Sequence, residues 1–182
     1  MKIHFVTCNP GKVKEFKEIL EPNTKVEQLA IDYPELRSDD PEEIAKLAAK
    51  QLADLLKKPI VVEDSGLFIK ALNDLPGTCS AYIHKRIGLK GLLKLMKGVK
   101  DRSCQYKSAV AYCEPKKQPI SFLGKEQGKI AQKPKGKHGF GHDPIFIPKG
   151  KRKTYGEIEN VEKTKKFRRK AVLKLKRYLE KS

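Results

Sequence analysis

We expect the chain to be organised around one segment, Phe5-Val6-Thr7-Cys8-Asn9-Pro10-Gly11-Lys12. Apolar residues at its start, together with Ile3, predict a short buried strand. Beyond it the apolar residues recur with helical spacing, at Val13, Phe16, Ile19 and Leu20. The stretch is therefore a tight turn that joins a strand to a helix, with Asn9 as a favoured N-cap residue and Pro10 in the first helical position.

The start of this helix suits an anion. Amide N–H groups and the positive end of the helix dipole favour phosphate there, and Thr7 adds a hydroxyl and Lys12 a charge. Two interpretations stay open from these residues alone, a phosphate-binding turn and an ordinary capped helix.

The 182 residues suit one domain, or two lobes sharing a core. The N-terminus lacks the features of a secretory signal, and there is no long apolar run, so we expect a cytoplasmic protein without a membrane partner. Four cysteines without CxxC spacing predict neither a zinc site nor disulfides, and we expect them to be small core residues. The formal charge of +18 predicts attraction to polyanions or, alternatively, a solvated lysine-rich surface.

Further along the chain, a second buried strand ends on charged residues. Lys25 to Ala30 predicts a strand, and Asp40 caps an amphipathic helix that runs to about Lys57. Ile60 to Val62 then forms a strand buried on both faces, which we expect to end at Glu63-Asp64-Ser65-Gly66. Ligands bind at such strand ends, and alternation predicts that only one carboxylate faces the site while a basic group or the backbone holds the other. A solvated turn is the alternative.

The second half of the chain predicts a hairpin and a basic helix. Ser80 to Arg86 is expected to be a connecting segment and Gly88 to Met96 a short helix. Strands are predicted at Tyr106 to Tyr112 and Ile120 to Leu123, continued at Gly128 to Ala131. We expect a smaller lobe over about residues 75–131.

Gly139-Phe140-Gly141 holds one ring on a flexible backbone. Such a ring suits stacking on a base, although Phe140 could equally be core. From Lys163 the chain ends in a helix with an apolar stripe at Phe167, Ala171, Leu175 and Leu179. Its basic start is expected either to contact a nucleotide or to be solvated.

Several of these motifs occur together in the order and spacing of one family: Thr7-x-Asn9-x-x-Lys12-x-x-Glu15, Pro34-Glu35, Glu63-Asp64-Ser65-Gly66-Leu67, Pro76-Gly77 and Gly139-Phe140-Gly141-His142-Asp143-Pro144. The sequence resembles the inosine triphosphate pyrophosphatase family over nearly the whole chain. The resemblance implies hydrolysis of non-standard purine nucleoside triphosphates (ITP, dITP, XTP) to the monophosphate and pyrophosphate. It also implies an elongated α/β fold with a central mixed sheet flanked by helices, a cleft between two lobes, a single domain over residues 1–182, Mg²⁺ dependence and a homodimer.

The resemblance also implies roles for particular residues. Thr7, Asn9 and Lys12 would hold the triphosphate, with Glu15 supporting Lys12. Glu35 and Asp64 would hold Mg²⁺, and Asp64 would also orient or deprotonate the attacking water, which makes Asp64 and Lys12 the candidate catalytic residues. Three further roles are implied: Ser65 and Gly66 would shape the turn beneath the phosphates, Phe140 would stack on the base, and Asp143 would contact the nucleoside.

The sequence departs from the family pattern at two places. His142 stands where a larger aromatic residue is usual, and the Ser-His-Arg triplet before the last helix is missing. Depending on a one-residue gap, the arginine of the triplet falls on Arg168 or Arg169, and Lys163 matches a base-contacting lysine in one register. Lys and Arg can donate to the oxygen of a 6-oxo purine, so these three residues are candidate base ligands.

These departures from the family pattern leave two alternative functions open. One is a nucleic-acid-binding protein on the same scaffold, favoured by the +18 charge, although nucleic acid is not the expected partner. The other is a nucleoside triphosphate pyrophosphatase with an altered base preference.

Overall fold

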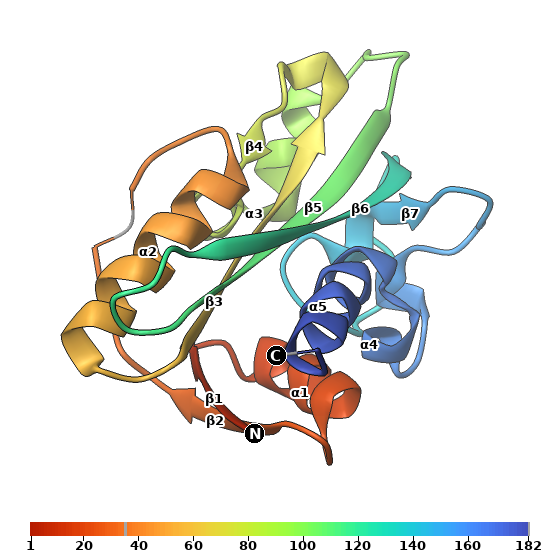
Figure 1. Ribbon diagram of the computed structural model, residues 1–182. Coiled ribbons are helices and arrows are strands. Elements are labelled where there is room, and N and C mark those ends of the chain that lie inside the picture. The colour runs from red at the N-terminus through yellow and green to blue at the C-terminus, as the bar shows by residue number, and fades with distance from the viewer. Residues whose placement is uncertain (35, 182) are drawn as a thin grey trace. The chain divides into compact units, whose positions relative to one another are not determined.

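The computed structural model describes residues 1–34 and 36–181 (Figure 1). Within them, one seven-stranded sheet has the order β2-β1-β3-β5-β6-β7, with β4 paired to β3. The strands are β1 (Lys2–Val6), β2 (Lys25–Leu29), β3 (Ile60–Ile69), β4 (Pro76–Gly77), β5 (Ser103–Cys113), β6 (Ile120–Ile130) and β7 (Phe146–Pro148). The α-helices are α1 (Pro10–Leu20), α2 (Pro41–Leu56), α3 (Ser80–Leu95), α4 (Val161–Thr164) and α5 (Lys166–Leu179), and short 3-10 turns are η1 (Lys70–Leu72), η2 (Asp143–Ile145) and η3 (Tyr155–Glu157).

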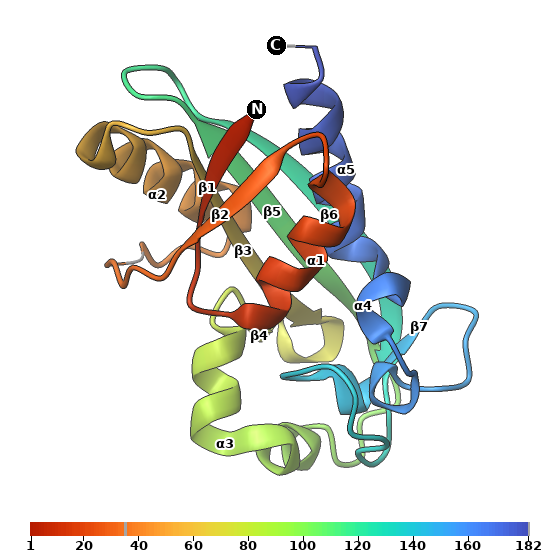
Figure 2. The same cartoon turned by 90° about the horizontal axis from the view of Figure 1, so that it is seen from below.

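The sheet is mixed, as predicted. Strand β1 pairs in parallel with both β2 and β3, whereas β3–β4 and β6–β7 are antiparallel. Figure 2 shows β1 and β2 side by side, with α1 following β1 through a short turn. The expected α/β class with a helix-flanked central sheet is therefore confirmed.

The chain divides into two compact units. Unit 1 comprises Met1–Asp64, Ser108–Gly124 and Phe167–Ser182, and unit 2 comprises Ser65–Lys107 and Lys125–Lys166. Strands β3, β5 and β6 contribute residues to both units. The smaller lobe expected over residues 75–131 stays a prediction.

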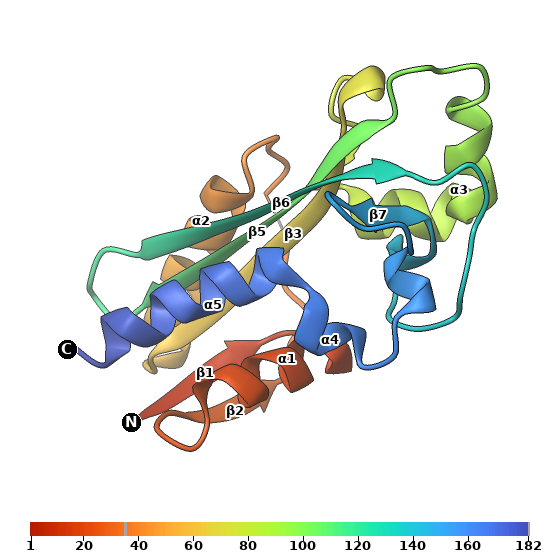
Figure 3. The ribbon, with the colours of Figure 1, turned by 90° about the vertical axis from the view of Figure 1, so that its right-hand side faces the viewer.

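In unit 1, both faces of the sheet are covered by helices. One buried cluster joins α1 and α5 to Ile3, Phe5 and Val61, and the other joins α2 to Ile60 and Val62 (Figure 3). This confirms that Ile60 to Val62 is buried on both faces, as its run of β-branched residues predicts.

Strand β3 does not end at Glu63, contrary to our prediction, but continues to Ile69. Ion pairs compensate the Glu63 charge, and Gly66 allows β4 to approach, since a Cβ on Gly66 would lie 1.9 Å from the Gly77 carbonyl oxygen. Ser65 and Gly66 therefore lie in a strand and form no turn. The expected shaping of a turn by these two residues is wrong.

The segment from Ser80 to Arg86 is the start of α3, contrary to the prediction of a connecting segment. Helix α3 buries only Ser80 and Leu92, so its sequence carries little apolar periodicity. The Ser80 hydroxyl ties it to the strand end by accepting the Leu67 N–H at 2.8 Å and donating to the Gly77 carbonyl at 2.7 Å. The backbone bends at Gly88, where φ is +61°.

The cysteine prediction holds only in part. All four cysteines are free, but only Cys104 and Cys113 are buried, whereas Cys8 and Cys79 are exposed. None of the helices in residues 1–34 and 36–181 has the length and apolarity needed to cross a bilayer.

Candidate active site

The turn between β1 and α1 is organised by the side chain of Asn9. The Asn9 Oδ1 accepts the backbone N–H groups of Gly11 at 2.9 Å and Lys12 at 3.3 Å. The backbone N–H of Asn9 donates to the Thr7 hydroxyl oxygen at 3.1 Å. The first helical amides are thus capped by Asn9. With Oδ1 used in this way, the Asn9 amide NH₂ and the Thr7 O–H are the donors that this turn can offer a ligand.

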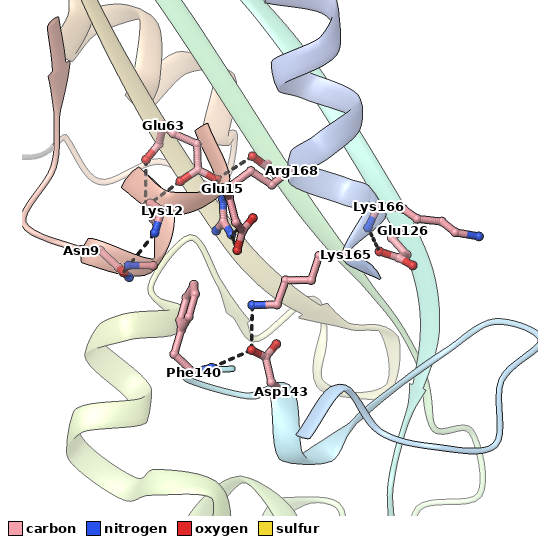
Figure 4. A network of polar contacts seen from close by, with 12 residues as sticks. Asn9, Lys12, Glu15, Glu63, Glu126, Phe140, Asp143, Lys165, Lys166 and Arg168 are labelled. Carbon is pink, nitrogen blue, oxygen red and sulfur yellow. Dashed lines mark hydrogen bonds and ion pairs between the residues drawn. The ribbon is translucent and has the colours of Figure 1, made fainter. Parts of the chain in front are cut away.

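Lys12 extends from this turn to β3. Its ammonium lies 2.7 Å from Glu63 Oε2 and donates to the Glu63 carbonyl oxygen at 3.0 Å. That carbonyl belongs to the peptide that leads into Asp64, so Lys12 lies beside the backbone that carries Asp64 in unit 1. Figure 4 shows Lys12 next to Glu63. The side chain of Lys12 is 18% exposed, and Asp64 is partly exposed.

Glu63 is the centre of a buried charge network. Its Oε1 accepts from Ser108 Oγ at 2.6 Å and from Arg168 Nε at 3.0 Å, while Arg168 Nη1 contacts both Glu15 oxygens at 2.8 and 2.9 Å (Figure 4). Lys12, Glu63, Arg168 and Glu15 thus alternate in sign. This confirms the expectation that a basic group holds one of the two β3 carboxylates.

The network shifts the pKa values of Glu63 and Arg168. Burial alone would raise the pKa of Glu63, but Arg168 and Lys12 beside it, with a hydrogen bond from Ser108, lower that pKa to about 2. Burial would lower the pKa of Arg168, but Glu63 and Glu15 raise it above its ordinary value. Glu63 is therefore a permanent anion that holds Lys12 in place.

Two expectations for this region change. We expected Glu15 to support Lys12, but the ion pair that holds Lys12 is made by Glu63, and Glu15 pairs with Arg168. We also expected Arg168 to be a candidate base ligand, but its side chain is 1% exposed and is paired with the carboxylates of Glu15 and Glu63. Its neighbour Arg169 is exposed, as is Lys163.

A second cluster lies in unit 2, around the predicted stacking ring. Asp143 Oδ2 accepts the Phe140 N–H at 2.7 Å and lies 2.8 Å from the ammonium of Lys165, which is 4.0 Å from the centroid of the Phe140 ring (Figure 4). Gly139 allows this arrangement, since its φ is +74° and a Cβ there would lie 2.1 Å from Asp143 Oδ2. Asp143 thus shapes the loop that carries Phe140.

Sequence reasoning missed Lys165. It is 1% exposed and separates α4 from α5, so the C-terminal helix begins at Lys166 rather than Lys163. Its extended backbone, with φ −60° and ψ 120°, interrupts the helix, and Glu126 Oε2 then accepts the Lys166 N–H at 2.8 Å. A lysine in a run of basic residues gives no sequence signal of burial.

The same loop contains the buried residue His142. Its ring meets His84 edge to face at 5.0 Å between centroids, and burial, with a smaller effect of His84, lowers the pKa of His142 to about 4. The unfolded chain binds a proton near pH 6.5, whereas the folded protein keeps His142 neutral down to about pH 4.

We therefore expect the free energy of unfolding to fall as the pH is lowered from 6.5 towards 4, with a His142 contribution of up to about 1.4 kcal/mol per pH unit. Urea unfolding at pH 7, 6 and 5 measures it, and His142→Phe should flatten the dependence in this window. His138→Asn is the control. A slope unchanged by His142→Phe would contradict the assignment.

Mg²⁺ is the metal that the family resemblance implies. Mg²⁺ is usually held by one or two carboxylates together with water and substrate phosphates. Residues 1–34 and 36–181 contain no group of three or more His, Cys, Asp or Glu side chains suited to a metal, but partly exposed Asp64 supplies one carboxylate. Glu35, the other predicted ligand, lies outside the described residues. The donor set thus fits a cation that arrives with a phosphorylated ligand.

The fold and these side chains define an α/β protein with a polar strand–helix turn, a lysine and a carboxylate-bearing strand, which suit a phosphorylated ligand. The model of the Ham1 family matches residues 3–178, so the chain belongs to the Ham1 family. The family resemblance stated above is thereby confirmed.

Individual relatives of known name and one solved structure are also similar to this chain. A dITP/XTP pyrophosphatase of Methanopyrus kandleri is 49% identical over 91% of this chain and 88% of its own length. One from Thermococcus kodakarensis is 45% identical over 91% and 89%. The Ham1 protein of Staphylococcus aureus has a TM-score of 0.85 and 31% identity, with 99% of this chain and 98% of that chain covered.

Proposed function

We propose that the protein hydrolyses non-standard purine nucleoside triphosphates, such as dITP and XTP, to the monophosphate and pyrophosphate. Its relatives named dITP/XTP pyrophosphatase support the substrate class. One observation carries the proposal: the Lys12 ammonium is held 2.7 Å from Glu63 Oε2 and 3.0 Å from the Glu63 carbonyl oxygen. Glu63 is the residue directly before Asp64, so Lys12 is held next to the proposed catalytic carboxylate.

In this proposal, unit 1 binds the phosphates. The Thr7 hydroxyl, the Asn9 amide and the Lys12 ammonium donate to phosphate oxygens, and the capping bonds fix the first two in advance. Because Glu63 already fixes Lys12, little side-chain entropy is lost when the phosphate binds. Lys12 then stabilises the charge that grows on the leaving pyrophosphate.

Asp64 aligns the attacking water and accepts its proton. Asp64, with Glu35, would hold Mg²⁺, which when bound neutralises phosphate charge. In unit 2, Phe140 stacks on the base, and the loop geometry set by Asp143 and Lys165 presents the ring. Ser65 is partly exposed beside Asp64 and stays a candidate substrate ligand.

The test is a turnover panel with dITP, XTP, dGTP and dATP, with pyrophosphate and orthophosphate assayed separately. We expect pyrophosphate as the product and kcat/KM for dITP and XTP about 100-fold or more above that for dATP. Chelation with EDTA should stop the reaction and added Mg²⁺ restore it. Orthophosphate as the product would overturn the reaction type, whereas equal rates on all four substrates would overturn only the base preference.

The homodimer belongs to the same proposal and rests on the family resemblance alone. Light scattering of the purified protein tests it, and a monomeric mass would contradict it. The cytoplasmic location stays a prediction.

A further inference from the structure

Unit 2 contains a concave surface that includes none of the proposed active-site residues. This pocket has a volume of about 760 Å³, and all of its lining residues belong to unit 2. The volume lies within the range of roughly 300–1,000 Å³ typical of small-molecule sites. We propose that it binds a nucleotide-sized organic phosphate, and we call it the basic pocket.

The base of the basic pocket is an open sheet face. Along β5 and β6, buried residues such as Tyr106 and Ile130 alternate with more exposed ones such as Gln105, Gln127 and Lys129, so the two strands turn a polar face outward. Two largely buried apolar residues, Phe68 and Pro148, also line the pocket. Apolar area together with amide donors and acceptors suits an organic ring.

The wall of the pocket is cationic. Five lysine or arginine side chains line it, against one carboxylate, that of Asp74. Lys149, Lys151 and Arg152 come from the loop after β7, which is fixed to the sheet: the Lys149 N–H donates to the Gln127 carbonyl at 2.9 Å and the Lys151 N–H to the Pro148 carbonyl at 3.0 Å. Gly150, with φ +79°, permits this turn. The backbone of the loop that carries these cations is therefore fixed beside the sheet.

Most of these charges have no carboxylate partner among the described residues; Lys70 pairs with Asp101 at 3.6 Å. Lys129, Lys151 and Arg152 make no ion pair with any carboxylate in the part of the chain that the structure describes. Lys107 adds a further charge nearby, 3.9 Å from the centroid of the Phe68 ring. Like charges gathered at a concave surface repel one another and focus a positive potential, which a phosphate group would relieve. A flat, solvated lysine coat would not need the concave shape or the fixed loop.

The test measures binding of α,β-methylene-ATP to the full-length protein by calorimetry in EDTA. This probe cannot be cleaved between the α- and β-phosphorus. Lys12→Ala weakens the proposed active site, so binding that persists in this variant reports the basic pocket. Added to Lys12→Ala, the substitutions Lys129→Ala/Lys151→Ala/Arg152→Ala should weaken that persistent binding by about tenfold or more. In the protein that retains Lys12, the same three substitutions should leave kcat/KM for dITP unchanged.

The matched control removes the same charge elsewhere. Lys58→Ala/Arg177→Ala/Lys181→Ala substitutes three exposed residues of unit 1, and it should leave the persistent binding unchanged. An equal loss in the control would overturn the proposal, because a general charge effect would then explain binding. Absence of binding in the Lys12→Ala protein would overturn it as well.

Two further arms separate the ligand classes. Inorganic tripolyphosphate should compete but bind more weakly than the nucleotide, since it lacks the ring; equal affinity would overturn the organic part of the proposal. A single-stranded RNA of twelve nucleotides whose affinity far exceeds that of the mononucleotide, with a steep salt dependence, would assign the surface to nucleic acid instead. A change of oligomeric state in the triple variant would assign it to contact between copies. The binding results do not depend on whether dITP is hydrolysed; only the comparison of kcat/KM does.

Discussion

Asp64→Asn is expected to lower kcat/KM for dITP by about three orders of magnitude. A positioned general base contributes typically about 10²- to 10⁴-fold, and an amide of the same shape can neither accept the proton of the attacking water nor supply a negative charge to a cation. Initial rates of pyrophosphate release at saturating Mg²⁺ measure the effect.

The fold should survive this substitution. Asp64 is partly exposed on β3, whereas the buried network is built on its neighbour Glu63, so the free energy of unfolding should change little. Glu18→Gln, which neutralises an exposed carboxylate on α1, is the control and should retain full activity. A near-normal rate for Asp64→Asn would remove Asp64 from the mechanism.

Arg168→Met is expected to destabilise the protein by about 3–5 kcal/mol. The guanidinium contacts Glu15 and Glu63 in a buried setting, and its removal leaves two buried carboxylates without their shared partner. Urea unfolding at pH 7 measures the loss. The pKa of Glu63 should also rise, because Arg168 is the first of the cations that lower it.

Arg169→Met is the matched stability control, since Arg169 is exposed and adjacent; it should change the free energy of unfolding by no more than about 0.5 kcal/mol. Should Arg168→Met not fold, Arg168→Lys keeps the charge but loses the fork of donors and should show a smaller loss. Equal stability of the Met variants at 168 and 169 would contradict the buried network. A changed preference for dITP over dATP in Arg168→Lys would restore Arg168 as a base ligand.

Several helices and strands follow from local sequence signals such as capping residues and β-branched runs. Asn9-Pro10 set the start of α1 because capping and the missing proline N–H act within one turn, and Asp40-Pro41 did the same for α2. The β-branched run Ile60 to Val62 predicted a strand covered on both faces. The joint spacing of the motifs predicted the family, because residues that act on one ligand recur together in order.

The burial of particular charges, and the partner of each, depends on tertiary contacts. Glu63 pairs with Arg168 across 105 residues, and Asp143 pairs with Lys165, two contacts between segments whose local sequence is that of a solvated surface. The ion pairs of Glu63 let β3 continue past this residue, where local reasoning ended the strand. Burial of a charge depends on a partner brought by folding, and neither helical period nor strand alternation carries the identity of that partner.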